Sequence, residues 1–195
     1  MRNATITRTT AETAITLSLS IREDGERGQF SGTSGIGFFD HMLNAFAAHG
    51  SFDITLACQG DWQVDCHHTI EDIGIVLGKA FAACLADRCG IARFADILLP
   101  MDEALCRCAV DFGGRAFLVF DAAFKADSIG AYDTQMTVEF MRAFAYNAGL
   151  TLHMSVLYGE NDHHKTEACY KALAKCLKDA VRIVASAVPS TKGTL

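Results

Sequence analysis

The chain has 195 residues, of which half are hydrophobic and 21% are charged, and its formal net charge is −6. This length fits one domain or two small fused halves with an ordinary core. The acidic balance argues against nucleic acid as a partner, and no apolar run approaches the roughly 18 residues of a transmembrane helix. We therefore expect a globular protein that binds neither nucleic acid nor membrane.

The first twenty residues lack the contiguous apolar core of a signal peptide. Eight cysteines occur without a CxxC pair, and most lie in apolar segments, where a free thiol packs as a small hydrophobe. The pattern predicts a reduced, cytoplasmic protein. Cys66 adjoins a histidine pair, which leaves open whether it packs or acts as a soft metal ligand.

In chain order, the N-terminal segment alternates apolar and polar residues and predicts a strand, placed at 10–21. A helical stretch ending at Gly50 follows, then a strand over 53–58 and an apolar helix over 69–88 before Gly90. The second half predicts strands at 103–111, 115–124 and 151–159, and helices at 134–148 and 166–187.

The two halves follow the same order of elements. AHGSFDITLACQG in the first half corresponds to NAGLTLHMSVLYG in the second, and a histidine motif follows each. We therefore predict an α+β fold in which a β-β-α-β-α unit is used twice, with halves at 1–92 and 93–195. Helices are expected to cover one face of each sheet. Two prolines and no low-complexity linker indicate that the halves pack as one unit.

The motif HHxxE occurs twice, 96 positions apart, as HHTIE at 67–71 and HHKTE at 163–167. On a helix, positions i and i+4 share a face, so the first histidine of each copy can act with the glutamate. The second histidine points about 100° away, so two copies can serve two metal ions. Imidazole with carboxylate suits Mn, Fe, Zn or Ni better than Mg or Ca. A single pair would more often be structural, and the duplication favours metal.

Several segments together resemble the imidazoleglycerol-phosphate dehydratase family of L-histidine biosynthesis. They include GFFDHML (37–43), DCHHTIEDIG (65–74), DEAL (102–105), DFGGR (111–115), HHKTEA (163–168) and STKG (190–193), and the match covers essentially the whole chain. The resemblance implies a fold like ribosomal protein S5 domain 2, two Mn²⁺ ions per active site, and trimers assembled into a 24-mer with sites between subunits. It also implies dehydration of D-erythro-imidazoleglycerol phosphate to imidazole acetol phosphate through a metal-bound imidazolate.

The same resemblance implies a set of metal ligands. They are His41, His67, His68, Glu71, Glu139, His163, His164 and Glu167. This sequence departs from the common family pattern at Glu139, where many members carry histidine, and at Cys66, where an acidic residue is frequent. A carboxylate can still bind Mn²⁺. The alternative for Glu139 is an ordinary glutamate on a helix surface, and the alternative for His41 is a histidine on a helix face.

Three carboxylates are candidates for acid–base catalysis: Glu12, Glu71 and Glu167. Glu12 matches a family glutamate near the substrate, although an exposed strand glutamate is the alternative. Asp72 either stabilises a helix start or orients a ligand histidine. The residues expected to bind the substrate and its phosphate are Glu12, His49, Arg93, Arg115, Lys171, Ser190 and Lys192. His49 could instead cap a helix end.

Two other functions compete with a dehydratase. A dimetal hydrolase of a phosphorylated small molecule would need the same ligands and cations, but it would aim a metal-bound water at phosphorus. A dehydratase instead needs an open metal position for the substrate imidazole. A non-enzymatic metal-binding assembly protein would have no use for the ordered arginine and lysine set, which argues against it.

Overall fold

The structure is a computed structural model that describes residues 2–23 and 25–191. The first half contains β1 (Arg2–Thr9), β2 (Ala14–Ile21), β3 (Phe30–Thr33), α1 (Gly37–Gly50), β4 (Phe52–Gln59) and α2 (His67–Leu85). The second contains β5 (Phe94–Met101), β6 (Ala104–Asp111), β7 (Phe117–Asp121), the short strands β8 (Ser128–Ile129) and β9 (Tyr132–Asp133), α3 (Met136–Ala148), β10 (Thr151–Tyr158) and α4 (Asp162–Ala180).

Each half forms its own four-stranded sheet, and the two sheets have the same topology. Their strand orders are β1-β2-β4-β3 and β5-β6-β10-β7, so the third strand of each sheet in chain order lies at an edge in both. That edge strand pairs in parallel with its neighbour, whereas the other pairs are antiparallel. The repeated topology confirms the predicted duplication and the α+β fold class.

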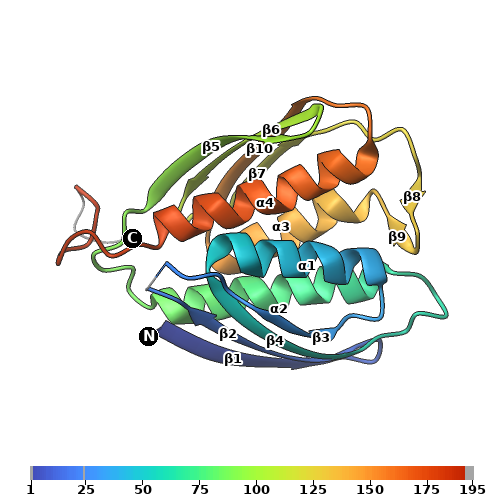
Figure 1. Ribbon diagram of the computed structural model, residues 1–195. Helices are drawn as coiled ribbons and strands as arrows, with labels where there is room; N and C mark the ends of the chain where they lie inside the picture. Colours follow the sequence, from blue (N-terminus) through green and yellow to red (C-terminus); the bar gives the residue numbers. More distant parts are fainter. Residues whose placement is uncertain (1, 24, 192–195) are drawn as a thin grey trace.

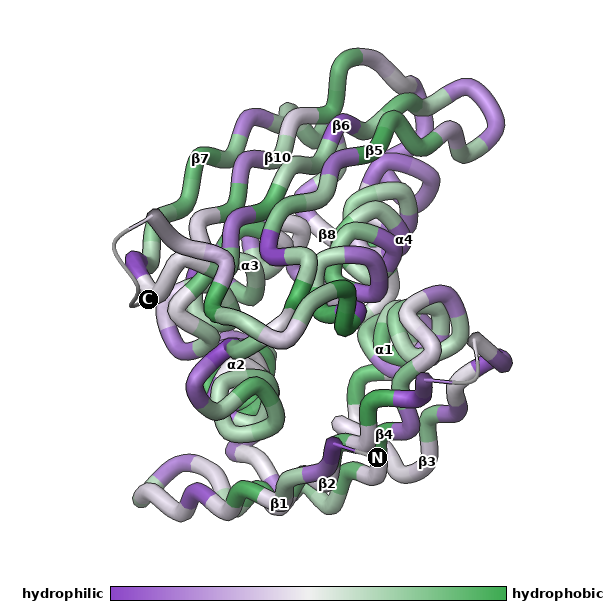
Figure 2. The backbone as a smooth tube through the Cα atoms, turned by 90° about the vertical axis from the view of Figure 1, so that its left-hand side faces the viewer, coloured by the Kyte–Doolittle hydropathy of each residue, from purple (hydrophilic) through white to green (hydrophobic). Residues whose placement is uncertain are grey.

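The molecule has four layers, in which the helices lie between the two sheets (Figures 1 and 2). Helix α2 packs on β1 and β2, and α4 packs on β5 and β6. Across the middle, α1 packs against α4 and α2 packs against α3. Helices therefore cover one face of each sheet, as predicted. No helix within the described ranges is long and apolar enough to cross a membrane.

Alternation along the strands places apolar side chains against the helices. In β2, Ile15, Leu17, Leu19 and Ile21 are buried, while the polar residues between them are more exposed. This is the period-2 pattern of a sheet with one covered face.

Aromatic rings from the two halves meet at the centre of the core. Phe39 of α1 and Phe140 of α3 have ring centroids 5.4 Å apart in an edge-to-face arrangement, and Phe46 and Phe144 lie 6.3 Å apart. All four rings are fully buried. Burial of each such side chain contributes roughly 1.5–3 kcal/mol, so this contact helps to hold the halves together.

Two glycines allow α2 to approach α3 very closely. A Cβ on Gly74 would lie 3.1 Å from the carbonyl oxygen of Phe140, and a Cβ on Gly78 would lie 2.6 Å from that of Phe144. Glycine weakens a helix interior by about 1 kcal/mol relative to alanine. The close backbone contact accounts for its presence at both positions.

The structure contains strands that the predicted ranges lack: β1 and β3 in the first half, and β5 with the short β8 and β9 in the second. The expected strand at 10–21 is shortened to β2, which begins at Ala14, because the hydroxyl of Thr10 accepts the backbone N–H groups of Glu12 and Thr13 and turns the chain between β1 and β2. Strand β3 is short and mostly exposed. Strand β5 contains Pro100, which an edge strand tolerates but which obscures the sequence signal.

The helix boundaries also differ from the predicted ones. Helix α2 begins at His67 rather than at residue 69, and α4 runs over Asp162–Ala180 rather than 166–187. The Asn161 side chain accepts the backbone N–H of His163 and so starts α4 earlier. Both HHxxE motifs consequently lie within the first turns of their helices.

Candidate active site

The two histidine motifs lie at the same end of the molecule. Helices α1, α2 and α4 all begin on the right-hand side of Figure 1. The Asp65 carboxylate accepts the backbone N–H of His67 at 2.7 Å, and Asn161 accepts that of His163 at 2.9 Å. Each motif is therefore held by a polar side chain just before the helix.

One cluster joins the two halves and consists of His41, His163 and Glu167. The Oε2 atom of Glu167 lies 3.5 Å from Nε2 of His41 and 3.2 Å from Nε2 of His163. One ligand atom from each of the three residues lies within 4.8 Å of the others. The i, i+4 pair of His163 and Glu167 was predicted from spacing, whereas His41 arrives from α1. Two imidazoles and a carboxylate in this space fit Mn, Fe, Zn or Ni.

Lys171 controls the ionisation of the carboxylate in this cluster. Its Nζ atom lies 2.6 Å from Oε1 of Glu167, one helical turn away. Burial of Glu167 opposes its ionisation, but Lys171 and then the two histidines outweigh that effect and leave the pKa of Glu167 below its usual value. The carboxylate therefore remains charged, with one oxygen facing Lys171 and the other facing the histidines.

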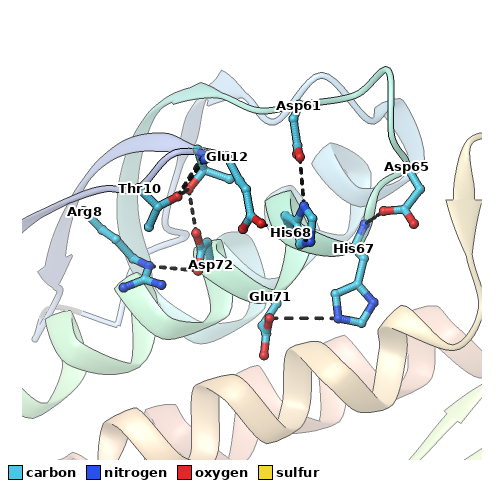
Figure 3. A network of polar contacts seen from close by, with 10 residues as sticks. Arg8, Thr10, Glu12, Asp61, Asp65, His67, His68, Glu71 and Asp72 are labelled. Atoms are coloured by element: carbon cyan, nitrogen blue, oxygen red, sulfur yellow. Dashed lines mark hydrogen bonds and ion pairs between the residues drawn. The ribbon is translucent and has the colours of Figure 1, made fainter.

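The first motif lies in a second polar network (Figure 3). Nε2 of His67 is 3.9 Å from Oε2 of Glu71, which again reflects the i, i+4 spacing. The neighbouring His68 faces elsewhere: its Nε2 is 3.7 Å from Oε1 of Glu12, and its Nδ1 is 2.8 Å from Oδ2 of Asp61. The contact with Asp61 is the main reason that the pKa of His68 is raised.

The second motif has a matching arrangement around His164. Its Nδ1 lies 2.7 Å from Oε2 of Glu103, and its Nε2 lies 3.5 Å from Oδ2 of Asp102. The other oxygen of Glu103 accepts the backbone N–H groups of Glu160 and Asn161. The Asn161 amide, followed by His164, lowers the pKa of Glu103 to about 2.

Sequence reasoning missed the roles of Asp61, Asp102 and Glu103. The segment DEAL at 102–105 belongs to the family resemblance, but no periodicity connects a turn between strands with a helix start 61 residues later. Asp61 lies in the connection between β4 and α2, where spacing carries no information about side-chain direction. These contacts arise from tertiary packing alone.

Asp72 anchors the turn that carries Glu12, and its carboxylate does not orient a ligand histidine. It accepts a hydrogen bond from Nε of Arg8 at 2.8 Å (Figure 3) and another from the hydroxyl of Thr13 at 2.5 Å. Arg8 is the next-to-last residue of β1 and Thr13 precedes β2, so these contacts fasten the β1–β2 turn to α2. Asp72 itself is buried.

Glu139, a predicted ligand, is paired with Arg142 on the next turn of α3. Glu139 is the main cause of the raised pKa of Arg142, and the charge of Glu71 makes a smaller contribution in the same direction. Helix α3 packs on α2, which carries Glu71, and Glu139 does not belong to the cluster of His41, His163 and Glu167. Binding of a metal ion by Glu139 would compete with Arg142.

The predicted phosphate residues divide into two groups. Lys171 lies beside Glu167, and His49 stands in the last turn of α1, where burial and then Lys171 lower its pKa. Arg93 instead donates to both oxygens of Asp111, at 2.7 and 3.2 Å, and to the carbonyl oxygen of Pro189 at 2.7 Å. The second group, near the end of α4, is Arg93, Arg115 and Ser190, while Lys192 lies outside the described residues.

The second group is far from the histidine motifs within one chain. The backbone N–H of Arg93 bonds to the carbonyl of Ala180, at the last residue of α4, whereas His164 is near its start. At 1.5 Å per residue, the intervening helix is about 24 Å long. Figure 1 shows these two ends of α4 on opposite sides of the molecule.

The duplicated α+β fold and the paired histidine motifs together define an enzyme class whose site is built from imidazole and carboxylate groups. Residues 34–177 match the sequence model of the family described as imidazoleglycerol-phosphate dehydratase. The chain is 52% identical over 198 residues to the imidazoleglycerol-phosphate dehydratase of Methylorubrum extorquens and 53% identical over 197 residues to that of Lacticaseibacillus casei. In both comparisons the whole of each chain is covered.

Solved structures support the same assignment. The crystal structure of imidazoleglycerol-phosphate dehydratase from Staphylococcus aureus is similar with a TM-score of 0.83 and 34% identity, covering 93% of this chain and 99% of that one. IGPD from Pyrococcus furiosus in complex with (S)-C348 is similar with a TM-score of 0.82 and 34% identity, covering 97% and 100%. The chain belongs to the imidazoleglycerol-phosphate dehydratase family, a family of hydro-lyases.

Proposed function

We propose that this chain dehydrates D-erythro-imidazoleglycerol phosphate to imidazole acetol phosphate in histidine biosynthesis. The names of its relatives give this reaction its first support. The observation that carries it is the convergence of His41 and His163 with Glu167 and Lys171 across the two halves. This arrangement combines metal-ligand chemistry with a cation suited to a phosphorylated substrate.

We further propose two Mn²⁺ ions per active site. The residues that would hold them are His41, His67, His68, Glu71, Glu139, His163, His164 and Glu167. When bound, the ions supply Lewis-acid chemistry at this site. The fit is best supported for His41, His163 and Glu167, whose donor atoms already lie close together. The other proposed ligands lie in separate contacts within one chain.

Loss of water from a diol needs one proton taken from carbon and one delivered to the departing hydroxyl. Glu12 is our candidate for proton transfer at the hydroxyl, because its exposed carboxylate lies 3.7 Å from Nε2 of His68 at the rim of the site. Glu71 and Glu167 are the further candidate catalytic carboxylates. Fastening of the β1–β2 turn by Asp72 would hold Glu12 in place.

We propose that complete sites form between subunits. The residues assigned to the phosphate near Arg93 lie about 24 Å from His164 along α4, far more than the length of a substrate with one ring and a three-carbon chain. A neighbouring copy of the chain would therefore supply one of the two groups. On this proposal, each of the halves 1–92 and 93–195 contributes one histidine motif to the sites. We also propose that the chains form trimers, which assemble into a 24-mer.

The outer face of the second sheet supports self-association. It exposes large apolar side chains, including Phe94, Leu98, Phe117 and Val119. The outer face of the first sheet instead carries serine and threonine hydroxyl pairs such as Thr5 with Ser18. An apolar sheet face of this kind is typical of an interface, and we propose a second copy of this chain as its occupant.

A reducing cytoplasmic location is also part of the proposal. All eight cysteines lie in the described part of the chain and are free thiols. Cys106 and Cys169 have sulfur atoms 3.9 Å apart without a disulfide between them. Free thiols at this density are typical of proteins kept in a reducing compartment.

The reaction is tested by supplying imidazoleglycerol phosphate to Mn²⁺-loaded and chelated protein and following imidazole acetol phosphate. We expect turnover that disappears with the chelator and returns with Mn²⁺. Absence of product from metal-loaded, assembled protein would contradict the proposal. Release of inorganic phosphate from the substrate would instead favour a hydrolase.

A mixing experiment tests the shared site. His163→Ala and Arg115→Ala proteins are each expected to be inactive, because each lacks one group at every site. If they are dissociated and reassembled together, some sites receive an intact histidine from one chain and an intact arginine from the other. Random assembly then restores up to about a quarter of native activity. Complete inactivity of mixed oligomers would show that each site is built within one chain.

A further inference from the structure

The second histidine of each motif makes the same contact with a carboxylate. Nδ1 of His68 lies 2.8 Å from Asp61, and Nδ1 of His164 lies 2.7 Å from Glu103. An ionised carboxylate can only accept a hydrogen bond, so the hydrogen of each neutral imidazole must sit on Nδ1. Nε2 is then left with its lone pair, which is the form that binds a metal ion.

The two carboxylates come from different parts of the fold. Asp61 lies between β4 and α2, whereas Glu103 lies in the turn between β5 and β6. In the first half, the equivalent of that turn is the β1–β2 turn, which offers Glu12 to Nε2 of His68 instead. Duplication of a half does not by itself produce matching Nδ1 contacts. Different elements supply the carboxylate at Nδ1 of His68 and at Nδ1 of His164. This recurrence indicates that the site requires a carboxylate at both positions.

Asp61 adds a second observation. Its side chain is 13% exposed, and within the described ranges its Oδ1 atom is buried without a hydrogen-bond partner. An unsatisfied buried oxygen destabilises the fold. Its presence is explained if the other oxygen is needed at His68. Glu103 is arranged differently, because its second oxygen accepts two backbone N–H groups.

We propose that Asp61 and Glu103 are positioning residues that fix His68 and His164 in the Nδ1–H tautomer and so present Nε2 to a metal ion. This inference rests on the metal site of the proposed function. Carboxylates that hydrogen-bond to a ligand histidine without touching the metal commonly orient its ring, and their loss weakens metal affinity by about 10- to 100-fold.

The variant Glu103→Gln gives the sharpest test. The two backbone N–H groups of residues 160 and 161 need an acceptor, so they hold the amide oxygen of the new side chain. Its NH₂ group then faces Nδ1 of His164 and can only donate, which forces the hydrogen onto Nε2. We expect this tautomer change in metal-free protein labelled with ¹⁵N at histidine, measured by solid-state NMR at alkaline pH where the imidazoles are neutral.

Metal affinity provides the second readout. Titration of Mn²⁺ into the metal-free proteins is expected to show affinity about 10- to 100-fold weaker for Glu103→Gln and Asp61→Ala than for the unaltered protein. Asp61→Asn should recover part of the loss, because its amide oxygen can accept from Nδ1. Glu23→Ala removes the same charge from an exposed position just after β2 and serves as the control.

Two results would overturn the positioning role. One is an unaltered protein in which His68 and His164 carry the hydrogen on Nε2, and the other is a Glu103→Gln protein with unchanged tautomer and affinity. Because the tautomer is measured in metal-free protein, the result does not depend on whether the protein binds Mn²⁺ or catalyses the proposed reaction. A wild-type protein that binds no Mn²⁺ would contradict the metal site, while the tautomers would still decide the role of Asp61 and Glu103.

Discussion

At the scale of single residues, Glu167 depends on Lys171 for its charge. The carboxylate is 8% exposed and the ammonium 18%, so solvent screens the pair only weakly. Lys171→Met should raise the pKa of Glu167 and lower the free energy of unfolding by about 1–3 kcal/mol. Urea unfolding of the metal-free protein measures the loss. Lys175→Met, one turn further along α4, is the matched control, and an equal loss in both variants would refute a specific pair.

A second prediction concerns Asp162, whose carboxylate accepts the backbone N–H groups of Lys125 and Ala126 and pairs with Lys165. Burial opposes its ionisation, but Lys165 and the two amides outweigh burial and lower the pKa of Asp162 below 3.8. The folded state therefore binds this proton less tightly than the unfolded state. The stabilisation is present above pH 3.8 and is lost as the pH falls through the lower folded value.

The pH dependence of unfolding by urea tests this sign. The metal-free protein should lose stability as the pH is lowered from above 3.8. Asp162→Asn should lose less over the same range, since it has no carboxylate to protonate, although it begins from a lower stability because Lys165 is left buried without its partner. Parallel curves for the two proteins would show that another carboxylate is responsible.

At the scale of elements, the β1–β2 turn is fastened to α2 through Asp72. Thr13→Val keeps the side-chain volume but removes the donor to Asp72. We expect a loss of about 1 kcal/mol in unfolding free energy and a larger fall in kcat than in substrate affinity, because Glu12 moves with the turn. Thr7→Val, which removes a surface hydroxyl pair with Thr16, is the control. Equal kcat in both variants would argue against a role for the turn.

The sequence predicted elements well where a periodic pattern ran long and ended at a glycine. Helix α1 ends at Gly50 and α3 ends just before Gly149, as expected. Prediction from the sequence failed where a strand was short or was interrupted by a turn. The Thr10 turn divides one apparent strand into two, and β3 has too few buried residues to register.

The candidate site divides in the same way. Contacts at i and i+4, such as His163 with Glu167, follow from helical spacing. The approach of His41 depends on packing of α1 against α4 and was available only through family resemblance. The carboxylates of Asp61 and Glu103 lie in connections between elements, where no period operates, and so they appeared only in three dimensions.

At the scale of the whole molecule, the two outer sheet faces differ in chemistry, and assembly should depend on one of them. Leu98→Glu places a charge on the exposed apolar face of the second sheet, where we expect it to disrupt the oligomer. Thr5→Glu makes the same change on the polar face of the first sheet and should leave assembly intact. Sedimentation velocity distinguishes the two. Unchanged sedimentation of Leu98→Glu would exclude this face as an interface.

The contact of α2 with α3 at Gly74 and Gly78 has a consequence for how the protein tolerates mutation. Most helix pairs are separated by side chains, so their spacing drifts as those side chains are exchanged over generations. Here the backbones themselves limit the approach. We therefore expect substitutions elsewhere in the core to have little effect on the distance between Glu71 on α2 and Glu139 on α3. On this view, the side chains around the helices can change during evolution while the separation of these two carboxylates stays the same.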